Sequence, residues 1–198
     1  AQPEVGRSTG TRISSYLLVE YLERIGVDVI FGLCGHTNIA FLDALSKSRI
    51  RFLTSRHEQV SAHSADGYAR VTGKPGVVLS HLGPGLTNCA TGVANAALDS
   101  IPMVVIAGDI PSYYYGRHPH QEVNLHQDAD QFQIFRPFCK RVYRADRVED
   151  LPRIVERAFH LARQRAASSA RSAGRGARPE ASGRPDGRRS AILSRYES

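Results

Sequence analysis

The sequence lacks tryptophan, has one methionine, and holds only three cysteines among its 198 residues. Cys34, Cys89 and Cys139 are odd in number, far apart and form no C-x-x-C pair, which argues against a disulfide framework or a zinc site. They predict free thiols in a reducing, cytoplasmic compartment. No stretch approaches the roughly 18 consecutive apolar residues of a membrane span. Residues 1–6 also lack the charged-then-apolar layout of a signal peptide.

Acidic residues are scarce at one end of the chain, and this imbalance produces most of the net charge of +7. Residues 163–198 hold nine arginines and three acids, a balance of +6, which leaves +1 for residues 1–162. A basic tail binds polyanions weakly and without sequence choice. This tail also lacks the interleaved aromatic residues on which nucleic-acid bases stack. We therefore expect no specific nucleic-acid function.

Apolar runs alternate with helical patterns through most of the chain. Runs typical of buried strands occur at residues 27–31, 50–54, 77–80, 103–107 and, as an edge strand, 140–143. Helical patterns occur at residues 14–25, 39–46, from 58 onward, 87–98 and 148–162, with a short helix at 128–135. This alternation predicts an α/β fold, with a doubly wound, mostly parallel sheet flanked by helices.

Three polar or glycine-rich segments directly follow predicted strands. They are Glu58, in the first turn of a helix with mostly small apolar residues, and the turns at residues 32–35 and 83–85. Ligands in doubly wound folds bind beyond the carboxyl ends of the strands. We therefore expect these segments to converge on one edge of the sheet.

Composition divides the chain into three parts. Residues 1–12 are polar and predict a flexible lead-in, and residues 13–162 predict a folded domain. Residues 163–198 are mostly Arg, Ala, Ser, Gly and Pro, and such a segment buries too little apolar surface to offset its ordering. We expect either a genuine disordered tail or a frame-shifted coding region. Sequencing the gene around codon 163 separates them, because a frame shift requires an intact strand in another frame.

Four segments, in this order along the chain, resemble thiamine-diphosphate-dependent enzymes of the acetolactate synthase type. They are residues 29–35 (VIFGLCG, with Cys34 where proline is usual), 56–70 (RHEQVSAHSADGYAR), 80–88 (SHLGPGLTN) and 120–123 (HQEV, with His120 in place of phenylalanine). The resemblance extends from about Ser14 to Ala162. It covers only the N-terminal, pyrimidine-binding domain of a family whose chains normally have three domains.

The resemblance implies thiamine diphosphate as the cofactor and Glu58 as the carboxylate that hydrogen-bonds N1′ of its aminopyrimidine. Other residues implied to contact the cofactor are Gly35, Gly83, Pro84, Gly85 and Asn88. Gln121 matches a glutamine near the reacting substrate, and His81 is a further catalytic candidate. The diphosphate and Mg²⁺ belong to a different, C-terminal domain of the family, whose G-D-G…N-N motif is not in this sequence. No metal ligands are expected here.

Plainer interpretations exist for several of these residues. An acid such as Glu58 is also favoured at a helix N-terminus by the helix dipole, and Gln121 could be a surface loop residue. His36 and His81 could donate protons to a substrate or could simply be hydrogen-bonded loop histidines. Three further histidines, His118, His120 and His126, resemble a metal cluster only weakly, because a third fixed ligand is missing. The turn at residues 83–85 lacks the lysine of a phosphate-binding loop.

The resemblance implies decarboxylation of a 2-keto acid and carboligation to a second carbonyl, from a 2-keto acid or an aldehyde. It also implies a homodimer or homotetramer in the parent enzyme and, in some members, FAD. Related members are decarboxylases, aldehyde lyases or cyclic-dione hydrolases. A different class of hypothesis is a truncated, non-catalytic fragment that lacks the family's valine-rich strand after residue 162. A third is a stand-alone subunit completed by a partner chain.

Overall fold

The computed structural model describes residues 14–111, 114, 117, 121–123 and 131–164, and the backbone of 190–195. Its helices are α1 (Ser14–Arg24), η1 (His36–Asn38), α2 (Ile39–Ser46), α3 (Glu58–Thr72), α4 (Pro84–Leu98), η3 (Gln133–Phe135), η4 (Val148–Asp150) and α5 (Leu151–Arg163). Its strands are β1 (Val29–Gly32), β2 (Arg51–Thr54), β3 (Gly76–Ser80), β4 (Met103–Gly108), β5 (Arg141–Ala145) and β6 (Ser190–Arg195). The predicted elements are found within a few residues of their expected bounds. The predicted helix at 128–135 is described only from residue 131, where η3 forms a single turn.

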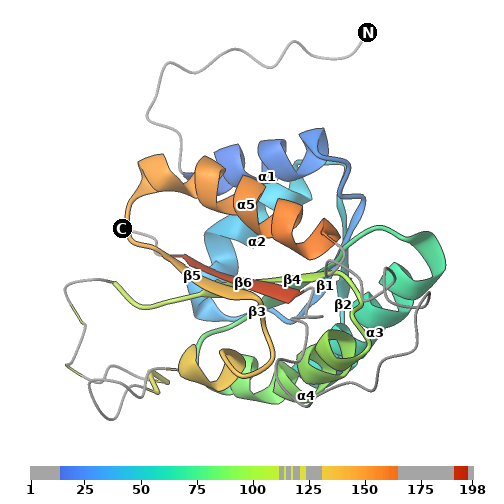
Figure 1. The fold of residues 1–198 in the computed structure, drawn as a ribbon. Coiled ribbons are helices and arrows are strands. Elements are labelled where there is room, and N and C mark those ends of the chain that lie inside the picture. Colours follow the sequence, from blue (N-terminus) through green and yellow to red (C-terminus); the bar gives the residue numbers. More distant parts are fainter. Residues whose placement is uncertain are drawn as a thin grey trace, which may run out of the picture.

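The six strands form one sheet in the order β2-β1-β3-β4-β6-β5, and every adjacent pair is parallel. Helices α1, α2 and α5 cover one face, and α3 and α4 cover the other (Figure 1). The predicted doubly wound α/β architecture is therefore confirmed, including the edge position of the strand at residues 140–143. Parallel strands place all their carboxyl ends on the same edge, so the loops that follow them are brought together.

One strand contradicts the expectation from sequence. Residues 190–195 form β6, which lies between β4 and β5, with Leu193 in register with Ile106 on one side and Tyr143 on the other. The prediction that the chain lacks this sheet strand is wrong. The apolar run Ala191-Ile192-Leu193 is too short to stand out in an Arg/Ser-rich context, but β4 and β5 both present backbone groups that must pair. The rest of the expected tail, residues 165–189 and 196–198, lies outside the described residues.

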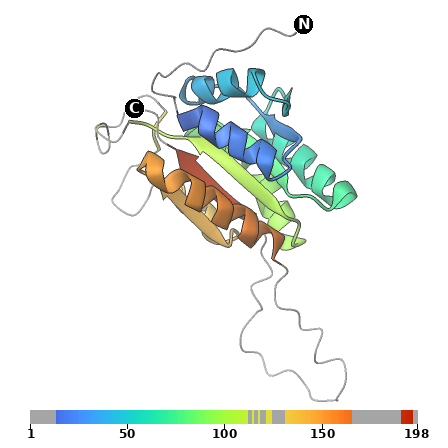
Figure 2. The same ribbon diagram turned by 90° about the horizontal axis from the view of Figure 1, so that it is seen from above.

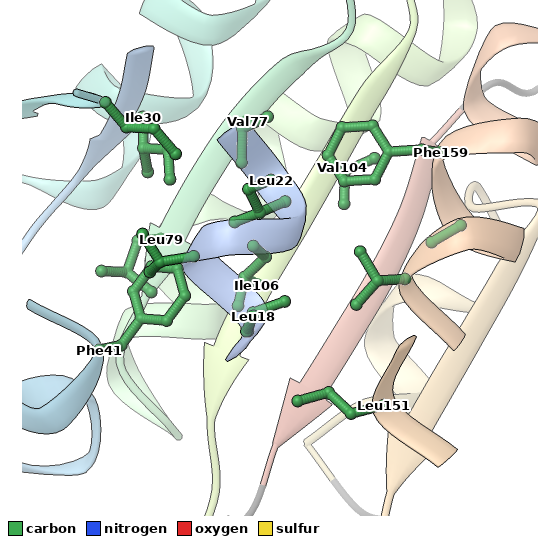
Figure 3. Packing of buried hydrophobic residues seen from close by; sticks show 14 of the residues in the cluster. Leu18, Leu22, Ile30, Phe41, Val77, Leu79, Val104, Ile106, Leu151 and Phe159 are labelled. Atoms are coloured by element: carbon green, nitrogen blue, oxygen red, sulfur yellow. The ribbon is translucent and has the colours of Figure 1, made fainter. Parts of the chain in front are cut away.

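Alternate side chains of the central strands pack into two separate cores. On β4, Val104 and Ile106 join the core beneath α1, α2 and α5, whereas Met103 and Val105 join the core beneath α3 and α4. The first core also contains Leu22 and the other residues drawn in Figure 3. Helices α1 and α5 lie side by side over this face (Figure 2). Burial on both faces explains why the strands read as continuous apolar runs.

The small apolar residues of α3 allow it to pack closely against α4. Ala62 and Ala65 are fully buried, and a Cβ added at Gly92 of α4 would lie 2.5 Å from the Ala62 Cβ. This close approach is the one expected from the small residues at helical spacing. It fixes the start of α3, which carries Glu58, relative to the start of α4, which carries the Gly-Pro-Gly turn.

Among the described residues, no helix is long and apolar enough to cross a membrane.

Hydrogen exchange tests the place of β6. We expect the amides of Ile192 and Leu193 to exchange as slowly as those of Val104 and Val105, because a strand paired on both sides has all its amides in ladder bonds. Exchange measured by mass spectrometry or NMR on the full chain would check this. Exchange of Ile192 and Leu193 at the rate of an unstructured peptide would contradict a paired β6.

Candidate active site at the carboxyl edge of the sheet

Four loops meet at the carboxyl edge of the sheet. The turn that contains Gly35 follows β1, Glu58 follows β2, His81 follows β3 and Asp109 follows β4. The predicted convergence of the first three on one edge is therefore found. The fourth, Asp109, was not expected to take part.

Glu58 is the first residue of α3, and its side chain turns inward. His57 caps the helix in an extended conformation, with its Nδ1 accepting from the Gln59 amide at 3.2 Å. The Glu58 residue is only 6% exposed, and Asn88 Nδ2 donates to its Oε2 at 3.0 Å. Among the described residues, no basic side chain forms an ion pair with it. The site therefore holds a buried carboxylate with one oxygen bonded by an amide.

The second carboxylate oxygen of Glu58 borders a gap left by a glycine. A Cβ added at Gly85 would lie 2.9 Å from Ser80 Oγ, 3.0 Å from the His81 Cβ and 3.3 Å from Glu58 Oε1. Any side chain there would crowd these three groups at once. Glycine at this position leaves room beside the carboxylate, and Pro84 starts α4 in a position where its missing amide hydrogen has no cost.

Gly83 and Gln121 approach each other through their backbones. Gly83 has φ +53°, and a Cβ there would lie 1.9 Å from the Gln121 carbonyl oxygen, so only glycine fits. Gln121 itself has φ +68°, a left-handed conformation that costs about 1–3 kcal/mol for a non-glycine residue. Such strain persists only where the surroundings fix it. This contact fixes Gln121 beside the Gly-Pro-Gly turn.

The turn after β1 lies against the imidazole of His81. A Cβ at Gly35 would be 2.5 Å from His81 Cγ, so glycine is required for the two loops to touch. Asn38 holds the turn closed: its Oδ1 accepts from the Gly35 amide at 2.9 Å and its Nδ2 donates to the Leu33 carbonyl at 3.2 Å. Asn38 is 2% exposed and was not singled out from sequence. Asparagine close behind a glycine is a known turn signal that could have identified it.

His81 connects two other loops through hydrogen bonds. Its Nδ1 lies 2.6 Å from Thr37 Oγ1, and its Nε2 lies 2.7 Å from Gln121 Oε1. The ring of His36 meets it edge-on, with centroids 4.5 Å apart. His81 is therefore a hydrogen-bonded loop histidine, and the structure brings it, His36 and Gln121 together. Thr37 is a partner that sequence patterns do not reveal, because it lies 44 residues away.

A buried polar network supports the Gly-Pro-Gly turn from behind. The Gly83 amide donates to Gln131 Oε1 at 2.5 Å, and Gln131 Nε2 donates to Asp109 Oδ1 at 3.4 Å. Asp109 in turn lies 3.2 Å from Arg144 Nη2. Burial raises the pKa of Asp109 to about 6, although the Arg144 guanidinium opposes this rise; nearby Glu122 adds to it. Gln131 and Asp109 were not predicted, since no local pattern marks residues that meet only in the folded chain.

The remaining predicted site residues fall into two groups. Pro84 and Asn88 lie on α4 at the same edge as Glu58. His118, His120 and His126 lie outside the described residues. No group of three or more His, Cys, Asp or Glu side chains among the residues with described side chains could hold a metal ion. The three cysteines are free thiols, with Cys34 exposed and Cys89 and Cys139 buried.

A parallel α/β domain with a buried glutamate facing a Gly-Pro-Gly turn defines the class of protein. Residues 14–133 match the family described as thiamine pyrophosphate enzyme, N-terminal TPP binding domain, and the chain belongs to this family. Similar proteins include the acetolactate synthase of Arthrospira platensis, 42% identical over 162 residues, which cover 80% of this chain and 26% of the relative.

Two further relatives are comparable. The chloroplastic acetolactate synthase of Arabidopsis thaliana is 42% identical over 74% of this chain and 21% of its own. The acetolactate synthase large subunit of Lactococcus lactis is 39% identical over 75% of this chain and 25% of its own. The chain thus spans about a quarter of the length of the curated relatives it matches.

The raised pKa of Asp109 gives the stability of the chain a distinctive pH dependence. Between the ordinary value of 3.8 and about 6, the folded chain keeps a proton on Asp109 that the unfolded chain has lost. The resulting stabilisation is complete below the ordinary value and is lost as the pH rises through about 6. Relative to Asp109→Asn, wild type should therefore lose about 3 kcal/mol of unfolding free energy across this window.

Urea unfolding at a series of pH values measures this difference. Asp146→Asn serves as a matched control, because Asp146 is an exposed acid that also pairs with Arg144. The control should follow the wild-type profile. Parallel pH profiles for wild type and Asp109→Asn would contradict a raised pKa at Asp109.

Proposed function

We propose that this chain supplies the pyrimidine-binding half of a thiamine diphosphate site. The observation that carries the proposal is the buried Glu58 carboxylate, with Asn88 on one oxygen and the gap left by Gly85 beside the other. These features fit the cofactor, because a flat ring needs backbone clearance and its ring nitrogen needs a carboxyl partner. When bound, thiamine diphosphate supplies the electron sink for decarboxylation and carbon–carbon bond formation. Glu58 shares a proton with N1′ through Oε1, the oxygen that faces Gly85.

The other site residues take positioning roles in this proposal. Gly35, Gly83 and Pro84 shape the backbone around the ring, and Asn88 keeps the Glu58 carboxylate in place. Burial in an apolar pocket favours the protonated form of a carboxyl group, which allows the proton to be shared. Gln121 lies next to this half-site and is available to contact a substrate.

For the parent protein we propose acetolactate synthase-like chemistry, in which a 2-keto acid is decarboxylated and joined to a second 2-keto acid or an aldehyde. The names of the relatives support this assignment. We further propose a homodimer or homotetramer, Mg²⁺ with the diphosphate in another domain, FAD as a possible additional cofactor, and a cytoplasmic location. The pyrimidine-binding domain comprises residues 13–162 in this proposal, with β6 completing its sheet.

The isolated chain has a second candidate function, as a non-catalytic half-site. Its sequence does not contain the G-D-G…N-N motif expected for diphosphate and Mg²⁺ binding. The 198-residue chain therefore binds the aminopyrimidine portion but does not catalyse carboligation alone. Addition of a complementary diphosphate-binding chain is required for activity.

Titration with the aminopyrimidine alcohol that forms one half of thiamine tests the proposed function. NMR or calorimetry on the full chain should show binding, and Glu58→Gln should weaken it about tenfold, because an amide cannot share the proton that the carboxyl group provides. Glu149→Gln, the same change at a well-exposed glutamate in η4, should bind like wild type. Equal affinity for wild type and Glu58→Gln, or no binding to wild type, would contradict the proposal.

A further inference from the structure

A single imidazole joins the three loops that surround the half-site. His81 follows β3, Thr37 lies in η1 after β1, and Gln121 lies in the segment that approaches Gly83. His81 is 7% exposed, and its Cβ is separated from the Glu58 carboxylate only by the gap at Gly85. Whatever this imidazole orients therefore lies beside the proposed pyrimidine position.

The chemistry of the two hydrogen bonds fixes the direction of each. The Gln121 amide oxygen can only accept, so His81 Nε2 must carry a hydrogen. In the neutral ring Nδ1 is then an acceptor, and the Thr37 hydroxyl donates to it. Thr37 thereby selects the tautomer that can bond Gln121. Contact with Gly35 and the edge of the His36 ring leaves the imidazole little room to turn.

The consequence falls on the other end of the Gln121 amide. With Oε1 engaged by His81, the amide cannot flip without breaking this bond, so its NH₂ is the group presented away from His81. Among the described residues, Gln121 Nε2 has no hydrogen-bond partner. The strained backbone of Gln121, with φ +68°, further restricts where this donor lies. The protein thus holds a hydrogen-bond donor in a fixed place next to the half-site.

We infer that His81 and Thr37 are positioning residues that hold the Gln121 NH₂ as a donor for a carbonyl or carboxylate oxygen of the substrate. This inference rests on the proposed function, because the substrate lies beside the pyrimidine only if the cofactor binds there. It assigns His81 a role through Gln121, not direct proton transfer. The favoured substrate is a 2-keto acid, whose adjacent carbonyl and carboxylate oxygens accept such a donor.

The experiment uses the isotope-labelled full chain, first with the aminopyrimidine alcohol and then with added pyruvate as the probe. Pyruvate should shift the Gln121 side-chain NH₂ resonance, and a long-range proton–nitrogen spectrum should show hydrogen on Nε2 of His81. His81→Ala should weaken the pyruvate-dependent shift about tenfold, the size of one hydrogen bond, and leave aminopyrimidine binding within about twofold. His81→Gln should restore most of the response, because its amide also donates.

Thr37 provides a second, independent variant pair that keeps the inference falsifiable if His81→Ala fails to fold. Thr37→Val should shift the His81 tautomer and weaken the pyruvate response, whereas Thr37→Ser, which keeps the hydroxyl, should preserve both. Normal aminopyrimidine binding with a pyruvate response unchanged in both His81→Gln and Thr37→Val would overturn this inference alone. Loss of aminopyrimidine binding by the wild-type chain would overturn the proposed function, and the inference with it.

Discussion

The structure depends on one costly feature, a carboxylate buried at the end of a helix. Removing Glu58 from water is unfavourable unless its oxygens are satisfied, and the start of α3 and the Asn88 amide both help to satisfy them. This arrangement requires α3 and α4 to start close together. The alanines of α3 and Gly92 of α4 make this possible, because they let the two helices touch nearly backbone to backbone. Close helix packing in one core therefore sets the geometry of the site.

Glycines then bring the loops into contact around this carboxylate. Gly35 lies against His81, Gly85 leaves the space beside Glu58, and Gly83 meets the backbone of Gln121. Each of these approaches would be blocked by a single Cβ. The loops are consequently held by backbone proximity and a few hydrogen bonds, not by large apolar side chains. A flat ligand can enter a site built in this way without displacing any side chain.

A second polar layer lies behind the first and has a different electrostatic character. Asp109 has a raised pKa because its burial outweighs the nearby Arg144, and it connects through Gln131 to the Gly83 amide. The protonation of this carboxyl group thus lies two hydrogen bonds away from the Gly-Pro-Gly turn. The His81 network and the Asp109 network meet at Gly83 and Gln121, which explains why a strained residue is tolerated there.

The sequence by itself determined the alternation of strands and helices, the convergence of loops at one edge, and the buried role of Glu58, because these follow from local periodicity and ordered motifs. Only the tertiary structure revealed β6, whose apolar run is short and is specified by its two neighbours in the sheet. It alone paired Thr37 and Gln121 with His81, 44 and 40 residues away, and Gln131 with Gly83, 48 residues away. Such contacts have no local pattern, since they arise only when separate strand ends are brought to one edge.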